Sequence, residues 1–313
     1  MPGNTETGDH LRSAVLLKRN DLLNYEELLR IVRLAVAMGM NKLRLTGGEP
    51  LVRRGVMDFI GELGEIDGLD EIRLTTNGVL LHDNAQQLYE AGVRNINISL
   101  DTMMPERFAE ITGRDLYERV WQGIETAIET GFRIKLNVVA MRGINDDEFK
   151  AFGELALARP LQVRFIEFMP MGEKSTWEKK RFISAEEILA CLAPLGELAA
   201  IGRSHLEGPA RMYSLTAPDG RTGRVGVISP ISHHFCDQCN RLRLTSEGKL
   251  RSCLLHNLES DLKELIRSGC SDEEIKGMIR ETILKKPKGH TLADDLSQSD
   301  RPTCVGQMSQ IGG

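Results

Sequence analysis

The chain has 313 residues, which is enough for two domains or for one large barrel with an additional region. Hydrophobic residues make up 41% of it, and counting glycine in place of tyrosine gives about 50% apolar residues, an ordinary globular value that excludes a disordered, collagen-like or disulfide-dense chain. The 40 Lys and Arg residues against 45 Asp and Glu residues give a net charge of −5, so we expect no nucleic-acid partner, which would need a basic surface.

Membrane and secretory signals are also missing from the sequence. No run of about 18 apolar residues could span a membrane; the stretch 188–201 comes closest, and Pro194 and Glu197 interrupt it. The first 20 residues contain one short apolar run, 14–17, unlike a secretory signal peptide. Six cysteines in the whole chain are too few for a secreted disulfide scaffold. We therefore expect no membrane contact and a reducing, cytoplasmic compartment.

The first predicted element is a helix that starts after Asn24. Asn24 with Glu27 three positions later is a capping-box pattern. An apolar stripe follows at Leu28, Ile31, Val32, Ala35 and Val36. Ser184 with Glu187 repeats the capping pattern before the apolar residues 188–192, which predicts a second helix start.

Strands and helices alternate between residues 42 and 168. Strands are predicted at Lys42–Thr46, Glu71–Thr75, Asn95–Leu100, Arg133–Ala140 and Leu161–Phe168. Helical patterns lie between them, at about 55–65, 82–91, 116–130 and 146–158. This alternation favours a parallel sheet with right-handed crossovers.

The pattern changes after about residue 203. Short segments, a cysteine-bearing loop and two helices follow: 211–215, 225–228, strands near 241–245 and 249–254, and helices at about 259–268 and 271–285. A Pro-, Asp- and Ser-containing tail ends in Gly312-Gly313. We therefore divide the chain into residues 1–203, residues 204–285 and a tail, 286–313.

Four of the predicted strands carry one polar and one apolar face. Lys42, Arg44 and Thr46 alternate with leucines, although strands of a parallel sheet are usually apolar on both sides. The other three polar faces are Arg73, Thr75 and Asn77; Asn95, Asn97, Ser99 and Asp101; and Arg133, Lys135 and Asn137. Because a buried unpaired charge is costly, this cationic face predicts an anionic ligand. A barrel interior that satisfies its own polar groups is the alternative.

The fifth strand departs from this pattern. Arg164 and Glu167 fall on opposite faces unless a bulge intervenes. Two loops follow strands: Gly47-Gly48 allows close backbone approach, and Glu49 places a carboxylate at the edge where ligands bind in α/β sheets. The sequence contains neither Gly-x-Gly-x-x-Gly nor a Walker loop, so a nucleotide would be held in another way.

Three cysteines form the clearest chemical motif. The spacing Cys236-x2-Cys239-x13-Cys253 suits zinc or an iron–sulfur cluster. Zinc would need a histidine ligand, His233, His234 or His256. A 4Fe–4S cluster on three cysteines would leave one iron free to bind a ligand atom. The spacing alone favours neither.

Two arginines follow the cysteine pair directly. If residues 241–245 form a strand, Arg241 and Arg243 point the same way. Two guanidinium groups on one face form a fork that suits a polyanion such as phosphate.

Several motifs together resemble one known family. They are Leu43–Leu51, Leu74–Gly78, Ile98–Asp101, Arg164–Met169, Cys236–Thr245 and the ending Ile311-Gly312-Gly313. In this order they resemble the molybdenum cofactor biosynthesis protein A family, the radical S-adenosylmethionine GTP 3′,8-cyclases. The resemblance runs from about Leu23 to the last residue.

The resemblance implies an α/β fold: a partial (βα)6 radical-SAM barrel lacking its first strand, plus a C-terminal α+β region with a second iron–sulfur site. It implies conversion of GTP to 3′,8-cyclo-7,8-dihydro-GTP in molybdenum cofactor (molybdopterin) biosynthesis. In that family a 4Fe–4S cluster cleaves S-adenosylmethionine, the resulting radical takes hydrogen from C3′ of GTP, and C3′ bonds to C8.

Site roles follow from the matching positions, as the resemblance implies. S-adenosylmethionine would be held by Gly48, Glu49, Ser99 and Met169. GTP would be held by Lys42, Arg44, Thr75, Lys135, Arg164, Arg241, Leu242 and Arg243. The second cluster would be bound by Cys236, Cys239 and Cys253, and its open iron would accept the guanine. The Gly-Gly tail would reach into the site, and the family favours a cluster over zinc.

Partners also follow from the resemblance. GTP is the expected substrate, an electron-donor protein the expected reductant, and cyclic pyranopterin monophosphate synthase the next enzyme in the pathway. A homodimer stays open.

One part of the family pattern is missing from the sequence. The family's first cluster needs Cys-x3-Cys-x2-Cys, but the first cysteine here is Cys191. Because that motif is commonly followed by Met-Pro and this sequence begins Met1-Pro2, we hypothesise a wrong start assignment or a truncation. Lys42–Thr46 should then be an edge strand unless the weak pattern at 11–17 covers it. We expect the chain as printed to be inactive; the alternative function is a non-catalytic GTP-binding iron–sulfur or zinc module.

Overall fold

The structure is a computed structural model that describes residues 19–170, 178–202 and 208–289. The segment 11–17 and the Gly-Gly ending, for which the sequence gives expectations, lie outside the described residues.

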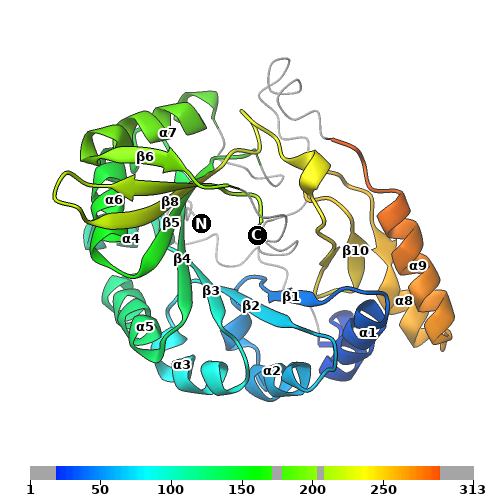
Figure 1. The fold of residues 1–313 in the computed structure, drawn as a ribbon. Coiled ribbons are helices and arrows are strands. Elements are labelled where there is room, and N and C mark those ends of the chain that lie inside the picture. The colour runs from blue at the N-terminus through cyan, green and yellow to red at the C-terminus, as the bar shows by residue number, and fades with distance from the viewer. Residues whose placement is uncertain (1–18, 171–177, 203–207, 290–313) are drawn as a thin grey trace.

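A mixed eight-stranded sheet forms the centre of the fold, in the order β1-β2-β3-β4-β5-β8-β7-β6. Its strands are β1 Lys42–Leu45, β2 Glu71–Thr76, β3 Asn95–Ser99, β4 Arg133–Ala140, β5 Leu161–Glu167, β6 Glu197–Ala200, β7 Arg211–Thr216 and β8 Thr222–Ile228. The first five strands and β8 run parallel, β7 is antiparallel to both of its neighbours, β8 and β6, and β6 therefore runs in the same direction as β8. Figure 1 shows the sheet curved, with helices along its outer side.

Helices cover the apolar face of this sheet. They are α1 Tyr25–Ala37, α2 Val56–Gly64, α3 Leu81–Glu90, α4 Pro105–Thr112, α5 Tyr117–Thr130, α6 Phe149–Ala158 and α7 Ala185–Leu192. Both predicted capping boxes, at Asn24–Glu27 and Ser184–Glu187, are confirmed. The sequence analysis missed α4, a short helix that opens with Pro105 at its first position.

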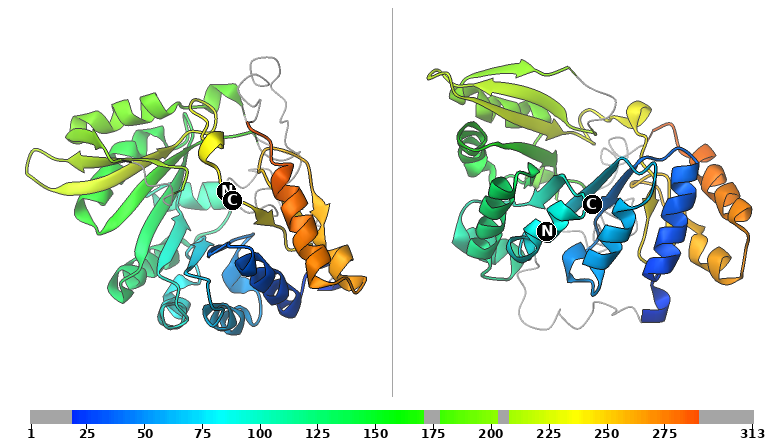
Figure 2. Two further views of the ribbon diagram at one scale, coloured as in Figure 1. Left: turned by 45° about the vertical axis from the view of Figure 1, so that its right-hand side comes forward. Right: turned by 60° about the horizontal axis from the view of Figure 1, so that its bottom comes forward.

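A smaller sheet stands beside β1. It contains β9 Arg243–Leu244, β10 Lys249–Arg251 and β11 Ser260–Asp261, in the order β11-β10-β9. The helices α8 Leu262–Arg267 and α9 Asp272–Leu284 complete this region. Figure 2 shows it next to α1.

The helix α1 joins this C-terminal region to the main sheet. One of its sides packs in the large core, and the other contributes Ile31 and Leu34 to a second core with Leu250, Leu262 and Ile275. Arg267 of α8 also pairs with Glu27 at the start of α1, at 2.8 Å. The position of the cysteine-bearing loop therefore depends on this shared helix.

The main sheet extends beyond the expected domain division and has β1 at one edge. The strands β7 and β8 come after residue 204 yet belong to the main sheet, so the sheet crosses the expected division at 203/204. Within the described ranges β1 pairs only with β2, so it is an edge strand there, as expected.

Arg164 and Glu167 lie on opposite faces of β5, without a bulge. The register with β4 is continuous from Leu161 to Glu167. Glu167 is only 1% exposed, on the face toward the helices. Its carboxylate accepts hydrogen bonds from the backbone N–H groups of Ala185 (3.1 Å), Ile231 (2.9 Å) and Ser232 (3.1 Å). The Ser232 hydroxyl also donates to it. Glu167 thus fixes the segment that leads to Cys236.

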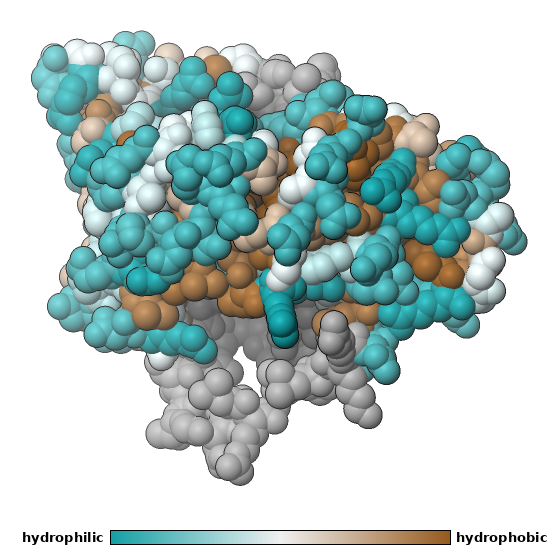
Figure 3. Space-filling view, turned by 90° about the horizontal axis from the view of Figure 1, so that it is seen from below, coloured by the Kyte–Doolittle hydropathy of each residue, from teal (hydrophilic) through white to brown (hydrophobic). Residues whose placement is uncertain are grey.

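On the side drawn in Figure 3 hydrophilic side chains predominate, with a band of hydrophobic ones between them. None of the helices within the described ranges is long and apolar enough to cross a membrane.

Replacing the Glu167 carboxylate should destabilise the fold. In Glu167→Gln one acceptor oxygen becomes an NH2 donor that faces N–H groups, so we expect a loss of about 2–4 kcal/mol in the free energy of unfolding. Urea unfolding measures it, and Glu62→Gln, an exposed residue of α2, is the control and should stay within about 0.5 kcal/mol. A Glu167→Gln variant as stable as the control would contradict this role.

Candidate active site

Polar residues form cross-strand rows on the inner face of the main sheet. The register places Arg44, Arg73, Asn95 and Arg133 in the first row, Thr75, Asn97, Lys135 and Gln162 in the second, and Ser99, Asn137 and Arg164 in the third. The residues between them in sequence face the helices, where Leu74, Ile96 and Ile134 are buried. The predicted division into one polar and one apolar face is confirmed.

Cations crowd together along these rows. Burial, and then the charges of Arg164, Arg73 and Arg44, lower the pKa of Lys135 to about 8. Burial, and then Arg44 and Arg73, lower the pKa of Arg164, which is 4% exposed. Because a guanidinium keeps its proton at ordinary pH, this repulsion stays in the free protein.

The C-terminal loop adds two more cations to the same place. Burial, and then Arg73 and Arg241, lower the pKa of Arg44, although Arg44 is accessible to solvent on its edge strand. Burial and Arg241 lower the pKa of Arg243, with Arg44 contributing. Arg44, Lys135 and Arg243, which are far apart in sequence, therefore belong to one connected group of charges.

Most of these cations have few anionic partners in the described residues. Arg164 donates to the Asn137 side-chain oxygen at 2.8 and 3.1 Å, and Arg44 donates to the Thr75 hydroxyl at 3.3 Å. Lys42 lies 3.5 Å from a carboxylate oxygen of Glu71. Neutral partners leave the positive charge uncompensated, which suits an anionic ligand.

The predicted Arg241–Thr245 strand is shorter than expected. Strand β9 begins only at Arg243, so the strand prediction for Arg241 and Leu242 was wrong. The Leu242 side chain packs against the second core, away from a polar site, so a contact of Leu242 with a ligand would come from its backbone. The Arg241 guanidinium stacks over the Phe235 ring at 5.2 Å.

The four residues assigned to S-adenosylmethionine lie at the carboxyl ends of strands. Gly48 and Glu49 follow β1, Ser99 ends β3, and Met169 follows β5. The Glu49 carboxylate accepts hydrogen bonds from the Thr76 hydroxyl (2.8 Å) and from the backbone N–H groups of Asn77 (2.7 Å) and Leu51 (3.2 Å). Its side chain therefore holds the loop against β2 and leaves the backbone for a ligand.

Two of the three motif cysteines share one 3-10 turn. The turn Cys236–Gln238 is closed by a hydrogen bond from the Cys239 backbone N–H to the Cys236 carbonyl, at 3.0 Å. Burial raises the pKa of the Cys239 thiol, but Arg241 and Lys286 outweigh it and bring the pKa to about 7. Lys286 Nζ lies 3.4 Å from Cys239 Sγ.

The third motif cysteine, Cys253, lies near Arg243. Cys239 and Cys253 both favour the charged form of Arg243, so both thiols lie near its guanidinium. No group of three His, Cys, Asp or Glu side chains among residues 19–170, 178–202 and 208–289 is arranged to hold a single metal ion. Two histidines that zinc would recruit have other partners: His233 contacts Glu186 at 2.5 Å, and His256 contacts the Gly289 carbonyl at 3.1 Å.

Arg73 and Glu71 are site residues that the sequence analysis did not assign. Arg73 was visible on the polar face of its strand, so the period-two pattern could have found it. Glu71 could not be found, because only the register shows that it stands beside Lys42.

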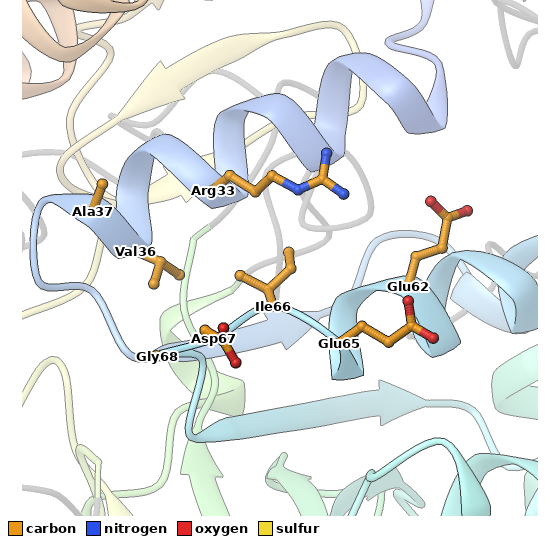
Figure 4. A pocket seen from close by; sticks show the side chains of 8 residues that line it. All are labelled: Arg33, Val36, Ala37, Glu62, Glu65, Ile66, Asp67 and Gly68. Carbon is orange, nitrogen blue, oxygen red and sulfur yellow. The ribbon is translucent and has the colours of Figure 1, made fainter.

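A hollow on the outer surface lies away from these rows. Figure 4 shows Arg33 of α1 extending toward Glu62 of α2 and Glu65, which follows this helix, with Val36, Ala37, Ile66, Asp67 and Gly68 around it. None of the motif residues lines it.

Comparisons with known proteins identify the family of this chain. Residues 12–156 match the Radical SAM superfamily, and residues 161–292 match Molybdenum Cofactor Synthesis C. A GTP 3′,8-cyclase of Thermodesulfovibrio yellowstonii is 43% identical over 300 residues, 95% of this chain and 89% of that protein. A GTP 3′,8-cyclase of Alkaliphilus oremlandii is 45% identical over 296 residues, 94% of this chain and 88% of that protein. The chain belongs to the GTP 3′,8-cyclase family.

A solved structure supports the radical SAM fold of this cyclase-family chain. Streptococcus suis SuiB has a TM-score of 0.57 and covers 92% of this chain and 71% of its own, at 13% identity. At that identity the likeness concerns the fold alone.

The crowded cations predict a pH-dependent stability. Lys135→Met should raise the free energy of unfolding at pH 7 by up to about 1 kcal/mol, because it removes like-charge repulsion. Since the folded chain releases this proton near pH 8 and the unfolded chain only near 10.5, wild-type stability rises between those values. The advantage of the variant should therefore shrink from pH 7 to pH 9.5 in urea unfolding.

The control for this measurement is Lys150→Met, which alters an exposed lysine of α6. If both variants show the same pH dependence, the pKa of Lys135 is not lowered in the folded chain.

Proposed function

We propose that this chain carries the GTP-binding and C-terminal cluster-binding residues of a GTP 3′,8-cyclase, the enzyme that converts GTP to 3′,8-cyclo-7,8-dihydro-GTP in molybdenum cofactor biosynthesis. The observation that carries the proposal is the meeting of Arg44, Lys135 and Arg164 on the sheet with Arg241 and Arg243 of the cysteine-bearing region. The relatives' printed name, GTP 3′,8-cyclase, supplies the substrate.

The cations would hold the phosphate chain of GTP. Lys42, Arg44, Lys135 and Arg164 provide charge on the sheet, and Thr75 provides a hydroxyl beside Arg44. Arg241 and Arg243 extend this charge to the thiols, so the two ends of one nucleotide could be held at once. Arg–phosphate contacts are charge-assisted and often bidentate.

S-adenosylmethionine would bind at the carboxyl ends of β1, β3 and β5. The Gly48 and Glu49 backbone, Ser99 and Met169 lie there, next to the third polar row. In α/β sheets this edge is where ligands bind.

The donor set of the C-terminal region fits a 4Fe–4S cluster. Cys236 and Cys239 share a turn, Cys239 and Cys253 both lie near Arg243, and the lowered pKa of Cys239 favours a thiolate ligand. A bound cluster with three protein thiolates would supply one open iron for a substrate atom. The engaged His233 and His256 disfavour zinc.

The residues present do not fit the family's first cluster. The printed sequence has no Cys-x3-Cys-x2-Cys, and its first cysteine is Cys191. We propose that this polypeptide alone does not cleave S-adenosylmethionine, because it lacks the ligands of that cluster. The resemblance adds an electron-donor protein, and cyclic pyranopterin monophosphate synthase as the next enzyme, as further predictions.

Cofactor loading tests the proposed cluster. After anaerobic reconstitution with iron and sulfide, the full chain should hold about four irons, and Cys236→Ala/Cys239→Ala should lose them. Cys270→Ala, which alters a cysteine outside the motif, is the control and should retain the iron. Zinc in place of iron in the purified protein would contradict the cluster.

Activity tests the function itself. With dithionite, S-adenosylmethionine and GTP, the reconstituted chain should form no 5′-deoxyadenosine above background. A chain fused to the family's Cys-x3-Cys-x2-Cys segment should form 5′-deoxyadenosine and the cyclised nucleotide. A fusion that loads both clusters and binds GTP but makes no product would favour the second candidate, a GTP-binding regulatory module.

A further inference from the structure

Arg73 stands in the middle of the cation group without a complete set of partners. It lies on the inner face of β2, and its side chain is 15% exposed. The parallel register puts it directly beside Arg44 of β1. Neighbouring strands are about 4.8 Å apart, so two arginines in this position repel each other.

The hydrogen bonds of Arg73 go to one shared carboxylate. Its Nη2 donates to Glu71 at 2.6 Å. Glu71 also receives a hydrogen bond from the Asn95 amide at 2.7 Å and lies 3.5 Å from Lys42 Nζ. The Nε of Arg73 is buried and has no hydrogen-bond partner in the structure as described. A buried donor without an acceptor is costly, so this site lacks an acceptor.

The surrounding charges identify the missing acceptor as a polyanion. Arg73 lowers the pKa of Arg44, Lys135 and Arg164, so four cations are close enough to repel one another. Glu71 is the carboxylate that lies near Arg44 and Lys135, and it already interacts with Lys42 and Arg73. A phosphate chain brings several negative charges and acceptor oxygens that match a guanidinium fork.

We propose that Arg73 is an additional binding residue for the phosphate chain of the nucleotide, with Glu71 as its counter-ion in the free protein. The inference rests on the proposed function for the identity of the nucleotide. Arg73 belongs to the first polar row, toward the amino ends of the strands, whereas Ser99 and Arg164 belong to the third. Since the proposed S-adenosylmethionine site at the carboxyl ends must face the ribose, Arg73 would contact the phosphates that lie farthest from the ribose.

The position of Arg73 predicts a loss of affinity that grows with the number of phosphates on the ligand. Arg73→Met should weaken GTP binding roughly tenfold or more, the range for one charge-assisted hydrogen-bonding group. The loss should shrink from GTP to GDP and vanish for guanosine, because guanosine has no phosphate. Arg73→Lys, which keeps the charge but loses the fork, should fall between wild type and Arg73→Met.

The test is isothermal titration of the full chain with guanosine, GMP, GDP, GTP and inorganic tripolyphosphate. Arg119→Met is the matched control, since it also removes one arginine that pairs with a carboxylate, Asp83, on outer helices. A thermal melt of each variant checks that it is folded. The control should bind every probe like wild type.

The outcomes separate the two claims. Suppose that wild type binds GTP, and that Arg73→Met either keeps its affinity for GTP or loses as much affinity for guanosine as for GTP. Arg73 then has no role at the phosphates, and the proposed function still stands. Tripolyphosphate binding that depends on Arg73, without any preference for GTP, supports Arg73 and contradicts the proposed function. If wild type binds neither GTP nor tripolyphosphate, both are wrong.

Discussion

Repulsion among cations on one face of a sheet is the constraint on which this molecule depends. Arg44, Arg73, Lys135 and Arg164 come from four different strands, and Glu71 is shared between two of the cations around it. Burial, and then repulsion by the neighbouring arginines, lower the pKa of Lys135 to about 8, so both disfavour its charged form. An anionic ligand relieves that repulsion, so binding energy is stored in the free site.

The apolar side of the same sheet holds the cation-bearing strands in place. Its residues pack against the helices in one large core, and Phe149 and Phe152 of α6 stack edge-on against Phe165 of β5. A hydrophobic core of this size fixes each strand in register, so the polar rows on the other face cannot move apart to reduce their repulsion. Two carboxylates complete the frame: Glu49 secures the loop after β1, and Glu167 secures the segment before the cysteine turn.

The C-terminal region brings the thiols to the cations through a shared helix. Because α1 packs in both cores, Arg243 of β9 and Arg241, which precedes this strand, lie near the edge strand β1, where Arg241 affects Arg44. A ligand that bridges the sheet and the cysteines would therefore contact elements more than 190 residues apart in the chain, Arg44 and Cys236. One nucleotide with a charged end and a base, as proposed above, would match this arrangement.

The sequence by itself determined the alternation of strands and helices, the two capping boxes and the polar face of each strand, because these depend on local periodicity and on neighbours three or four residues away. The spacing of its three motif cysteines also predicted a zinc or iron–sulfur site. Only the tertiary structure decided which polar residues lie side by side on neighbouring strands, with Arg73 beside Arg44 and with Glu71 interacting with both Lys42 and Arg73. It also decided that β7 and β8 join the main sheet. Register and long-range packing are set by the whole core, and no local pattern encodes them.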